Sequence, residues 1–224
     1  MPTYGNGYGQ VSFNLLNMRT DYQFRYFGNG WNEYAMSNVI TVCPEVPTQG
    51  HLSLTGDPIE MRVMWVSNQA PPAVPIVVWG VSPTQLTNKN PGQSHTYQAN
   101  DMCNAPANQT GARLYRNPGW MHDAVMAPLQ PGAIYYYQYG TEAAMSPVYA
   151  FRAAPLAQGN QPVRMMVYGD MGDGSLVPDA AGTAVRLKQH AEKGDVDFAL
   201  HIGDISYARS IGWAWEGFFN IIQD

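Results

Sequence analysis

The chain of 224 residues is poor in charged residues and rich in turn-forming and aromatic ones. Charged residues make up 13% of it, against about 25% in an average domain, and it holds 22 glycines and 17 prolines. This composition argues against coiled coils, long helical bundles and disorder. A net charge of −5 without a cluster of lysines and arginines argues against nucleic acid as a partner. No apolar run reaches the roughly 18 residues of a membrane-spanning helix, so we expect a β-rich chain without a membrane partner.

The two ends of the chain indicate a part of a longer protein. Residues 1–20 lack the basic start and apolar stretch of a signal peptide. Residues 218–224 read as the middle of an amphipathic segment, with no cap or turn to close it. We therefore expect the natural protein to continue past Asp224.

Two features bear on the compartment of the protein. Cys43 and Cys103 can form one disulfide or can both stay free and buried, and the sequence leaves both alternatives open. Asn108-Gln109-Thr110 is a glycosylation sequon in a stretch rich in Asn, Pro and Gly. Such a stretch suits a surface loop of an exported protein, so Asn108 is a candidate glycosylation site, although the tripeptide also arises by chance.

Residues 1–43 are predicted to form a β-rich N-terminal extension. The segment from Tyr22 to Phe27 alternates aromatic residues, and the segment 39–43 is rich in β-branched ones, so both are predicted strands. Pro44 and Pro47 then mark a boundary.

Residues 44–157 have the pattern of an antiparallel β-sandwich, because short apolar segments alternate with turn signals. The predicted strands are residues 61–66, 76–81, 122–126, 135–139 and 148–152. Leu129, Pro131, Gly132 and Tyr135 are spaced as in a tyrosine corner and resemble the late strands of a fibronectin type III domain. The alternative is an unrelated β-hairpin.

Residues 158–224 follow a different pattern, after a linker at 153–161. The segments 163–168 and 198–202 are apolar on nearly every residue, which predicts strands buried on both faces of a sheet. A helix is predicted between them, from a start at Pro178-Asp179 to a stop at Gly194, with Ala181, Ala184, Val185 and Lys188 on one face. A last helix is predicted over 213–222. The order strand, helix, strand, helix indicates the beginning of a parallel sheet.

Both of these strands end in the dipeptide Gly-Asp, at Gly169-Asp170 and Gly203-Asp204. Ligands bind at the carboxyl ends of parallel strands, and neighbouring strands lie about 4.8 Å apart. Asp170 and Asp204 can therefore share a metal ion through hard carboxylate oxygens, with Tyr207 close enough to join them. Taken singly, each aspartate also fits a turn or a helix N-cap, and Tyr207 also fits a packed aromatic residue.

Two other binding motifs fit this region poorly. The glycines at 169, 172 and 174 do not have the spacing of a dinucleotide-binding loop. The segment 170–174 lacks the alternating acidic residues of a calcium-binding hand.

The segments G-D-M-G (169–172) and G-D-I-S-Y (203–207) resemble the first two of the five metal-binding blocks of purple acid phosphatases. His201, Ala208 and Arg209 extend the second match, and the segments 61–65 and 101–103 resemble the domain that precedes the catalytic domain in the large, plant-type members. The resemblance covers nearly the whole chain. It implies a fibronectin type III-like β-sandwich at 44–157, followed at 158–224 by the start of an α/β metallophosphoesterase domain with a parallel β-α-β-α order.

The resemblance also implies a role for each candidate ligand. Asp170 would bind a ferric ion, Asp204 would bridge it to a second, divalent metal (iron, zinc or manganese), and Tyr207 would bind the ferric ion as a phenolate. The wider superfamily has D-x-H in the first block, whereas this chain has Gly172 in place of that histidine. The implied activity is acid phosphatase, the metal-assisted hydrolysis of small phosphate monoesters, in a secreted or vacuolar protein. Hydrolysis of nucleotide pyrophosphates or phosphodiesters is the alternative within the family.

The later metal-binding blocks of the family, G-N-H-D/E, V-x-x-H and G-H-x-H, are missing from the chain. The five histidines stand in none of these contexts, at His51, His95, His122, His190 and His201. We therefore expect the 224 residues to hold part of a metal site, to contain no complete set of catalytic residues and to be inactive alone. The alternative outside the enzyme class is a sandwich that binds through exposed aromatic residues, for which Trp31, Trp79 and Trp120 are candidates.

Overall fold

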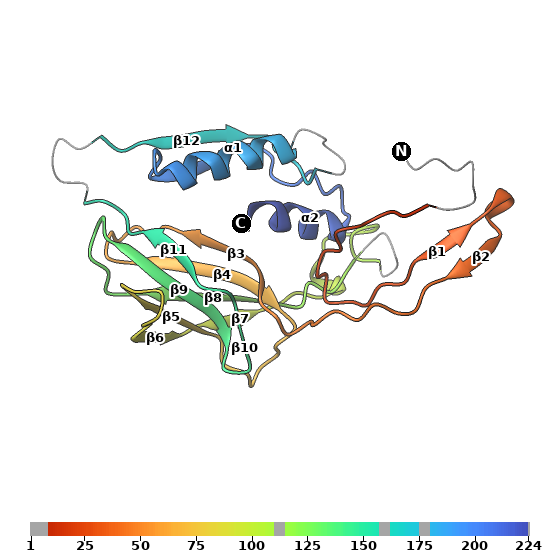
Figure 1. Cartoon of the computed structure of the whole chain (residues 1–224), viewed down its shortest axis with the longest axis horizontal. Helices are drawn as coiled ribbons and strands as arrows, with labels where there is room; N and C mark the ends of the chain where they lie inside the picture. The colour runs from red at the N-terminus through yellow and green to blue at the C-terminus, as the bar shows by residue number, and fades with distance from the viewer. Residues whose placement is uncertain (1–8, 110–114, 157–161, 175–179, 224) are drawn as a thin grey trace.

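The computed structural model describes residues 9–109, 115–156, 162–174 and 180–223. Most of the regular structure in these residues is antiparallel β-sheet, arranged as a sandwich of two sheets (Figure 1). The first sheet has the order β3 (Thr48–Ser53), β4 (Met61–Ser67), β8 (Trp120–Met126) and β7 (Gln93–His95). The second has the order β10 (Ala144–Met145), β9 (Ile134–Thr141), β5 (Ile76–Gly80) and β6 (Asn88–Pro91), and β11 (Tyr149–Arg152) also pairs with β9.

The core of the sandwich follows from the alternation of side chains along each strand. On β4 every second side chain from Met61 onward is buried, and Trp65 is 1% exposed. On β9 the buried residues include Tyr135, Tyr137 and Tyr139, which belong to the same core cluster as Val63 and Trp65 of the first sheet. The predicted β-sandwich is thus confirmed, and the five strands expected from the sequence all appear in it.

The tyrosine corner is also present. The hydroxyl of Tyr135 accepts a hydrogen bond of 2.9 Å from the backbone N–H of Gln130, five residues upstream. Leu129 is buried in the core beside it. This bond fixes the chain where it turns into β9, as the layout of the segment predicts.

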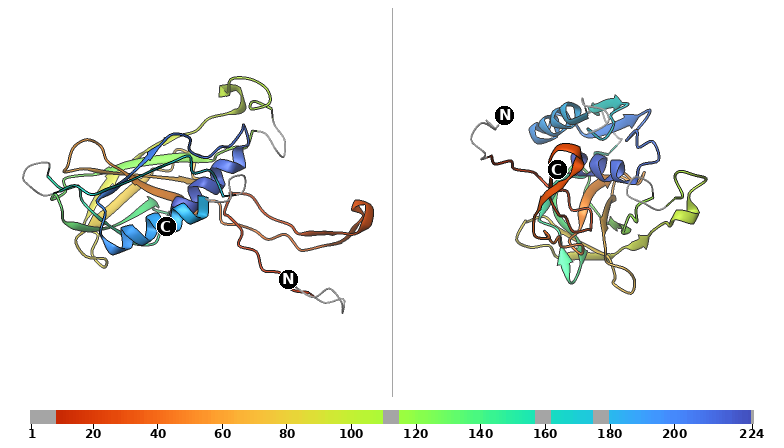
Figure 2. Two further views of the ribbon diagram at one scale, coloured as in Figure 1. Left: turned by 90° about the horizontal axis from the view of Figure 1, so that it is seen from above. Right: turned by 90° about the vertical axis from the view of Figure 1, so that its right-hand side faces the viewer.

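The N-terminal part forms a hairpin that projects away from the sandwich, as two views agree (Figures 1 and 2). Its strands are β1 (Arg25–Phe27) and β2 (Glu33–Met36), with a short 3-10 helix, η2 (Asn29–Trp31), between them. The prediction of a strand at 39–43 is wrong, because the only pairing of this segment in the described structure is a single bridge between Ile40 and Tyr22. A second 3-10 helix, η3 (Ala99–Asp101), follows β7.

The C-terminal part pairs two strands in parallel. β12 (Met165–Gly169) lies beside β13 (Phe198–Ile202), with Met165 opposite Phe198 and Gly169 opposite Ile202. α1 (Ala180–Lys193) connects them, and α2 (Gly212–Ile222) follows. The parallel pairing agrees with the prediction, and the predicted helix start at Pro178-Asp179 lies outside the described residues.

The expectation that both strands are buried on both faces is wrong for this structure. Met165 and Ile202 are each 52% exposed, and Val167 and Leu200 on the same face are also exposed. The opposite face is covered by α2, because Tyr168 and His201 pack toward Phe218. An apolar run therefore marked the strands correctly but did not show whether a second layer covers them.

The packing face of α1 also differs from the prediction. Ala180 is buried and Ala184 packs against the same cluster, whereas Ala181, Val185 and Lys188 are exposed. The packing face of α1 is therefore the one that holds Ala180 and Ala184, because Ala180, not Ala181, lies in the buried cluster with Met171 and Phe218 of α2.

α2 lies between the β12–β13 layer and the sandwich (Figure 1). It packs on β3, where the ring of His51 stacks on Phe219 with the ring centroids 5.3 Å apart. Cys43 and Cys103 are exposed and unbonded to each other. Among the described residues, no helix has the length and apolar character needed to cross a bilayer.

Candidate metal centre

The two Gly-Asp dipeptides meet at the carboxyl ends of β12 and β13. A Cβ on Gly169 would lie 2.1 Å from the carbonyl oxygen of Ile202, so the two backbones approach closely only because this residue is glycine. At Gly203, φ is +78°, and a Cβ would lie 2.8 Å from Oδ2 of Asp170. The carboxylate of Asp170 thus rests directly over Gly203, at the start of the second dipeptide.

Tyr207 returns to the same point from the loop after β13. Its hydroxyl donates a hydrogen bond of 2.5 Å to Oδ1 of Asp170. This bond, partial desolvation, the charge of Asp170 and a smaller contribution from Asp204 raise the pKa of Tyr207 to about 12. The structure therefore brings all three predicted ligands together: Asp170, Asp204 and Tyr207.

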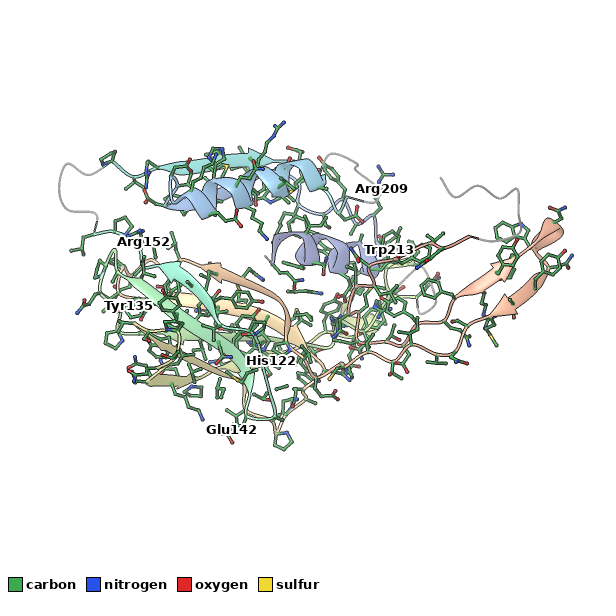
Figure 3. The ribbon with its side chains drawn as sticks, in the orientation of Figure 1. His122, Tyr135, Glu142, Arg152, Arg209 and Trp213 are labelled. Atoms are coloured by element: carbon green, nitrogen blue, oxygen red, sulfur yellow. The ribbon has the colours of Figure 1, made fainter. Side chains whose placement is uncertain are left out.

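The backbone at this point is in an unusual conformation. Asp170 and Tyr207 have φ values of +52° and +50°, and the left-handed conformation occurs again at Arg209 and Ser210. Non-glycine residues pay for such a conformation, and they cluster at functional sites. Figure 3 shows Arg209 in the loop that leads from the site to Trp213 at the start of α2.

Sequence reasoning missed the residues that support the two aspartates. Nε2 of His201 donates to the carbonyl oxygen of Asp204 at 3.0 Å, and the N–H of Gly172 donates to the carbonyl oxygen of Ile205 at 2.7 Å. The first bond holds the turn after β13, and the second ties it to the turn after β12. The sequence places His201 in a strand and beside the second Gly-Asp block without indicating this bond; its position three residues before Asp204 is the signal that points to it.

The donor set suits a hard, highly charged cation. Two carboxylates and a phenol offer only oxygen atoms, and the phenol of Tyr207 donates its proton to the carboxylate of Asp170. Oxygen ligands of this kind favour hard metal ions. In the described part of the chain, no group of three or more His, Cys, Asp or Glu side chains is placed to hold a metal ion.

The other candidates from the sequence lie away from this point. Trp79 is in the sandwich core, Trp120 is partly buried and Trp31 is 84% exposed on the N-terminal hairpin, so the three do not form one exposed patch. His122 is buried in the sandwich, above Glu142 in the lower half of the view in Figure 3. Asn108 is exposed, as a glycosylation site requires, while Thr110 of its sequon lies outside the described residues.

Comparisons with known proteins agree with this geometry. The sequence family described as "Purple acid Phosphatase, N-terminal domain" matches residues 47–153, which contain the sandwich. The structure of purple acid phosphatase PPD1 from seeds of yellow lupin (Lupinus luteus) superposes with a TM-score of 0.81 over 93% of this chain, at 31% identity. The chain belongs to the purple acid phosphatase family. It covers 39% of the lupin chain.

The curated relatives of this chain have names of two kinds, one that includes the word "inactive" and one that does not. "Probable inactive purple acid phosphatase 1" of Arabidopsis thaliana is 31% identical over 99% of the chain. "Acid phosphatase type 7" of Mus musculus is 32% identical over 72% of it. The chain spans 38% of the length of the first of these proteins and 32% of the second.

Proposed function

We propose that the protein to which this chain belongs is an acid phosphatase. It would hydrolyse small phosphate monoesters with the help of a ferric ion and a second metal ion, which is divalent. The observation that carries the proposal is the meeting of Asp170, Asp204 and Tyr207 at the ends of two parallel strands. We place the start of an α/β metallophosphoesterase domain at residues 158–224 and the fibronectin type III-like domain at 44–157. Family membership supports both assignments.

The residues of the chain have distinct tasks in this proposal. Asp170 and Tyr207 would hold the ferric ion, with Tyr207 releasing to water the proton that it now donates to Asp170. Asp204 would be a ligand shared between the ferric ion and the second metal, for which iron, zinc and manganese are the candidates. When bound, the two cations would activate water and neutralise negative charge on the phosphate. Gly203 leaves the space in which the Asp170 carboxylate is oriented.

The natural setting belongs to the same proposal. We expect a secreted or vacuolar protein, in which Asn108 carries a glycan and the substrates are small phosphorylated molecules. The exposed position of Asn108 supports the glycan. The remaining ligands would come from sequence outside these 224 residues, so we expect the chain alone to bind iron without turnover.

The experiment that tests the function uses the longest product of the gene that encodes this chain. Hydrolysis of p-nitrophenyl phosphate is measured at acidic pH for the wild type and for Asp204→Asn. Asp197→Asn is the matched control. Asp197 directly precedes β13, but it pairs with Arg164 at the start of β12, at the opposite end of the two strands from Asp204. We expect metal-dependent turnover that is reduced at least a hundredfold in Asp204→Asn and unchanged in Asp197→Asn.

Two results would redirect the proposal. Faster hydrolysis of bis(p-nitrophenyl) phosphate or of a nucleotide pyrophosphate would assign the protein to the other activities of the family. A wild-type protein that binds both metals but hydrolyses none of these substrates would contradict an enzymatic role and favour the relatives that are named inactive.

A further inference from the structure

A charged network joins three parts of the chain that are far apart in sequence. Oε1 of Glu216 on α2 forms an ion pair with Nη2 of Arg19 from the N-terminal part. Oε2 accepts a hydrogen bond of 2.5 Å from Nε2 of Gln49 on β3. The side chains of Arg19 and Glu216 are 3% and 8% exposed. Since the cost of desolvating both charges offsets their attraction, such a pair is weak evidence for a role in stability alone.

The local backbone conformation directs the side chains of Gln49 and Arg19 toward the carboxylate of Glu216. Gln49 lies at an irregularity in the pairing of β3 with β4, with φ at +61°, and a bulge of this kind re-aims a side chain. Its N–H also donates to Oε1 of Gln223, just past the end of α2, at 2.6 Å. Arg19 takes φ of +58°. Two non-glycine residues in the left-handed region thus converge on Glu216, and conformations of this cost persist where the surrounding structure requires them.

Glu216 in turn belongs to the helix on which the loop after Asp170 rests. Phe218 packs against Met171 in one buried cluster. A Cβ on Gly217 would lie 3.4 Å from the carbonyl oxygen of Asp173, so the helix backbone and this loop are in close contact. Met171 and Asp173 are only 3% and 4% exposed. The position of α2 therefore determines the position of the segment that begins at Asp170.

We propose that Arg19 and Gln49 are positioning residues for the candidate metal centre, which they reach through Glu216 and α2. The sandwich and the N-terminal part would then serve a purpose beyond packing, because they fix the helix that orients the Asp170 loop. The inference rests on the proposed function for the identity of the metal, but its structural part does not depend on metal.

The test follows the backbone amide of Gly172, whose bond to Ile205 reports the geometry of the loop. Hydrogen exchange of this amide is measured in the metal-free chain for Glu216→Gln and Gln49→Ala. Glu142→Gln is the matched control, since Glu142 pairs with Lys89 on the surface of the sandwich. We expect exchange at Gly172 to become at least tenfold faster in both variants, with no change in β4 and β9 and none in the control. The affinity for Fe³⁺ should fall at least tenfold in the same two variants.

Gln49→Ala keeps the test decisive if Glu216→Gln fails to fold, because it removes only a neutral hydrogen-bond partner and leaves the ion pair between Arg19 and Glu216 in place. Unchanged exchange at Gly172 in this variant, or an equal increase throughout the sandwich, would overturn the proposal. An Arg19→Lys variant should retain most of the protection, since it keeps the charge. A wild-type chain that binds no Fe³⁺ would contradict the proposed function alone, and the exchange at Gly172 would still decide the positioning role.

Discussion

The hydroxyl of Tyr207 donates to the carboxylate of Asp170 at 2.5 Å, although 37 residues separate the two in sequence. The contact exists because β12 and β13 are parallel neighbours, so the loops that follow them leave the sheet at the same edge. It places a phenol against two carboxylates, an arrangement in which the phenol keeps its proton until a cation replaces it.

The first prediction concerns the proton of Tyr207. Asp170→Asn removes the negative charge beside Tyr207 and replaces the carboxylate that accepts its hydrogen bond with a weaker, neutral amide oxygen, so the pKa of Tyr207 should fall from about 12 toward its usual value of about 10. An NMR titration of Cζ-labelled tyrosine measures it, and the signal is assigned by its absence in Tyr207→Phe. A pKa of Tyr207 that is the same in Asp170→Asn and in the wild type would show that the contact does not exist in solution.

The second prediction separates strain from the site itself. Gly203→Ala and Gly194→Ala both place a Cβ on a left-handed backbone, with φ of +78° and +64°. Each should lower the free energy of unfolding by about 1–2 kcal/mol. The new Cβ at 203 would lie 2.8 Å from Oδ2 of Asp170, whereas the one at 194 meets nothing within 4 Å.

Only Gly203→Ala should therefore weaken the binding of Fe³⁺, by at least tenfold. Unfolding in urea gives the stability of both variants, and equilibrium titration with Fe³⁺ gives the affinity. Equal affinities in the two variants would mean that Gly203 does not determine where the Asp170 carboxylate lies.

The sequence was a good guide to the sandwich because each of its strands has one buried and one outer face. Val63 and Trp65 stand two residues apart on β4, so in a strand they share one face, and this is the buried face of β4. It was a poorer guide to β12 and β13, where an apolar run is compatible with one covered face or two. The structure shows one face covered by α2 and the other exposed.

The candidate site was predictable in part for a similar reason. Gly-Asp at two matched strand ends is a local pattern, so Asp170 and Asp204 could be named from the sequence alone. The supporting contacts are not local: Glu216 meets Arg19 across 197 residues and Gln49 across 167. No periodicity or spacing in the chain relates these three residues, so only the folded arrangement reveals them.

The third prediction concerns stability in acid. His122 is 2% exposed, and its two ring nitrogens lie 2.9 Å from the hydroxyls of Ser67 and Ser94. Burial, with a smaller effect from His95, lowers the pKa of His122 from 6.5 to about 4. Between these two pH values the unfolded chain binds more protons than the folded one, so stability is full above about pH 6.5 and falls as the pH drops toward 4.

The loss should amount to about 3 kcal/mol across that interval, judged from the size of the shift. His122→Gln keeps a group that can bond to both serines but does not titrate, so its unfolding free energy should depend less on pH. His190→Gln is the control, because His190 lies on the surface beside Asp195. Equal slopes for the wild type and His122→Gln between pH 6.5 and 4 would contradict the assignment.

The fourth prediction tests the tyrosine corner. Tyr135→Phe removes the hydroxyl that accepts the N–H of Gln130, which should cost about 1 kcal/mol of unfolding free energy. Tyr136→Phe on the same strand is the control and should change stability by less than about 0.5 kcal/mol. Denaturant unfolding monitored by tryptophan fluorescence measures both. Similar losses in the two variants would show that the corner bond adds nothing specific.

The measurement that tests the central claim most directly is a titration of the chain with Fe³⁺, followed by visible absorption. If Tyr207 and Asp170 hold the ion, one equivalent should produce a charge-transfer band of a tyrosinate–iron pair. The band should be absent in Tyr207→Phe and kept in Tyr168→Phe, where the altered ring packs on α2 and His201 instead. A folded chain that gives no band, or a band that survives in Tyr207→Phe, would contradict the assignment of this site.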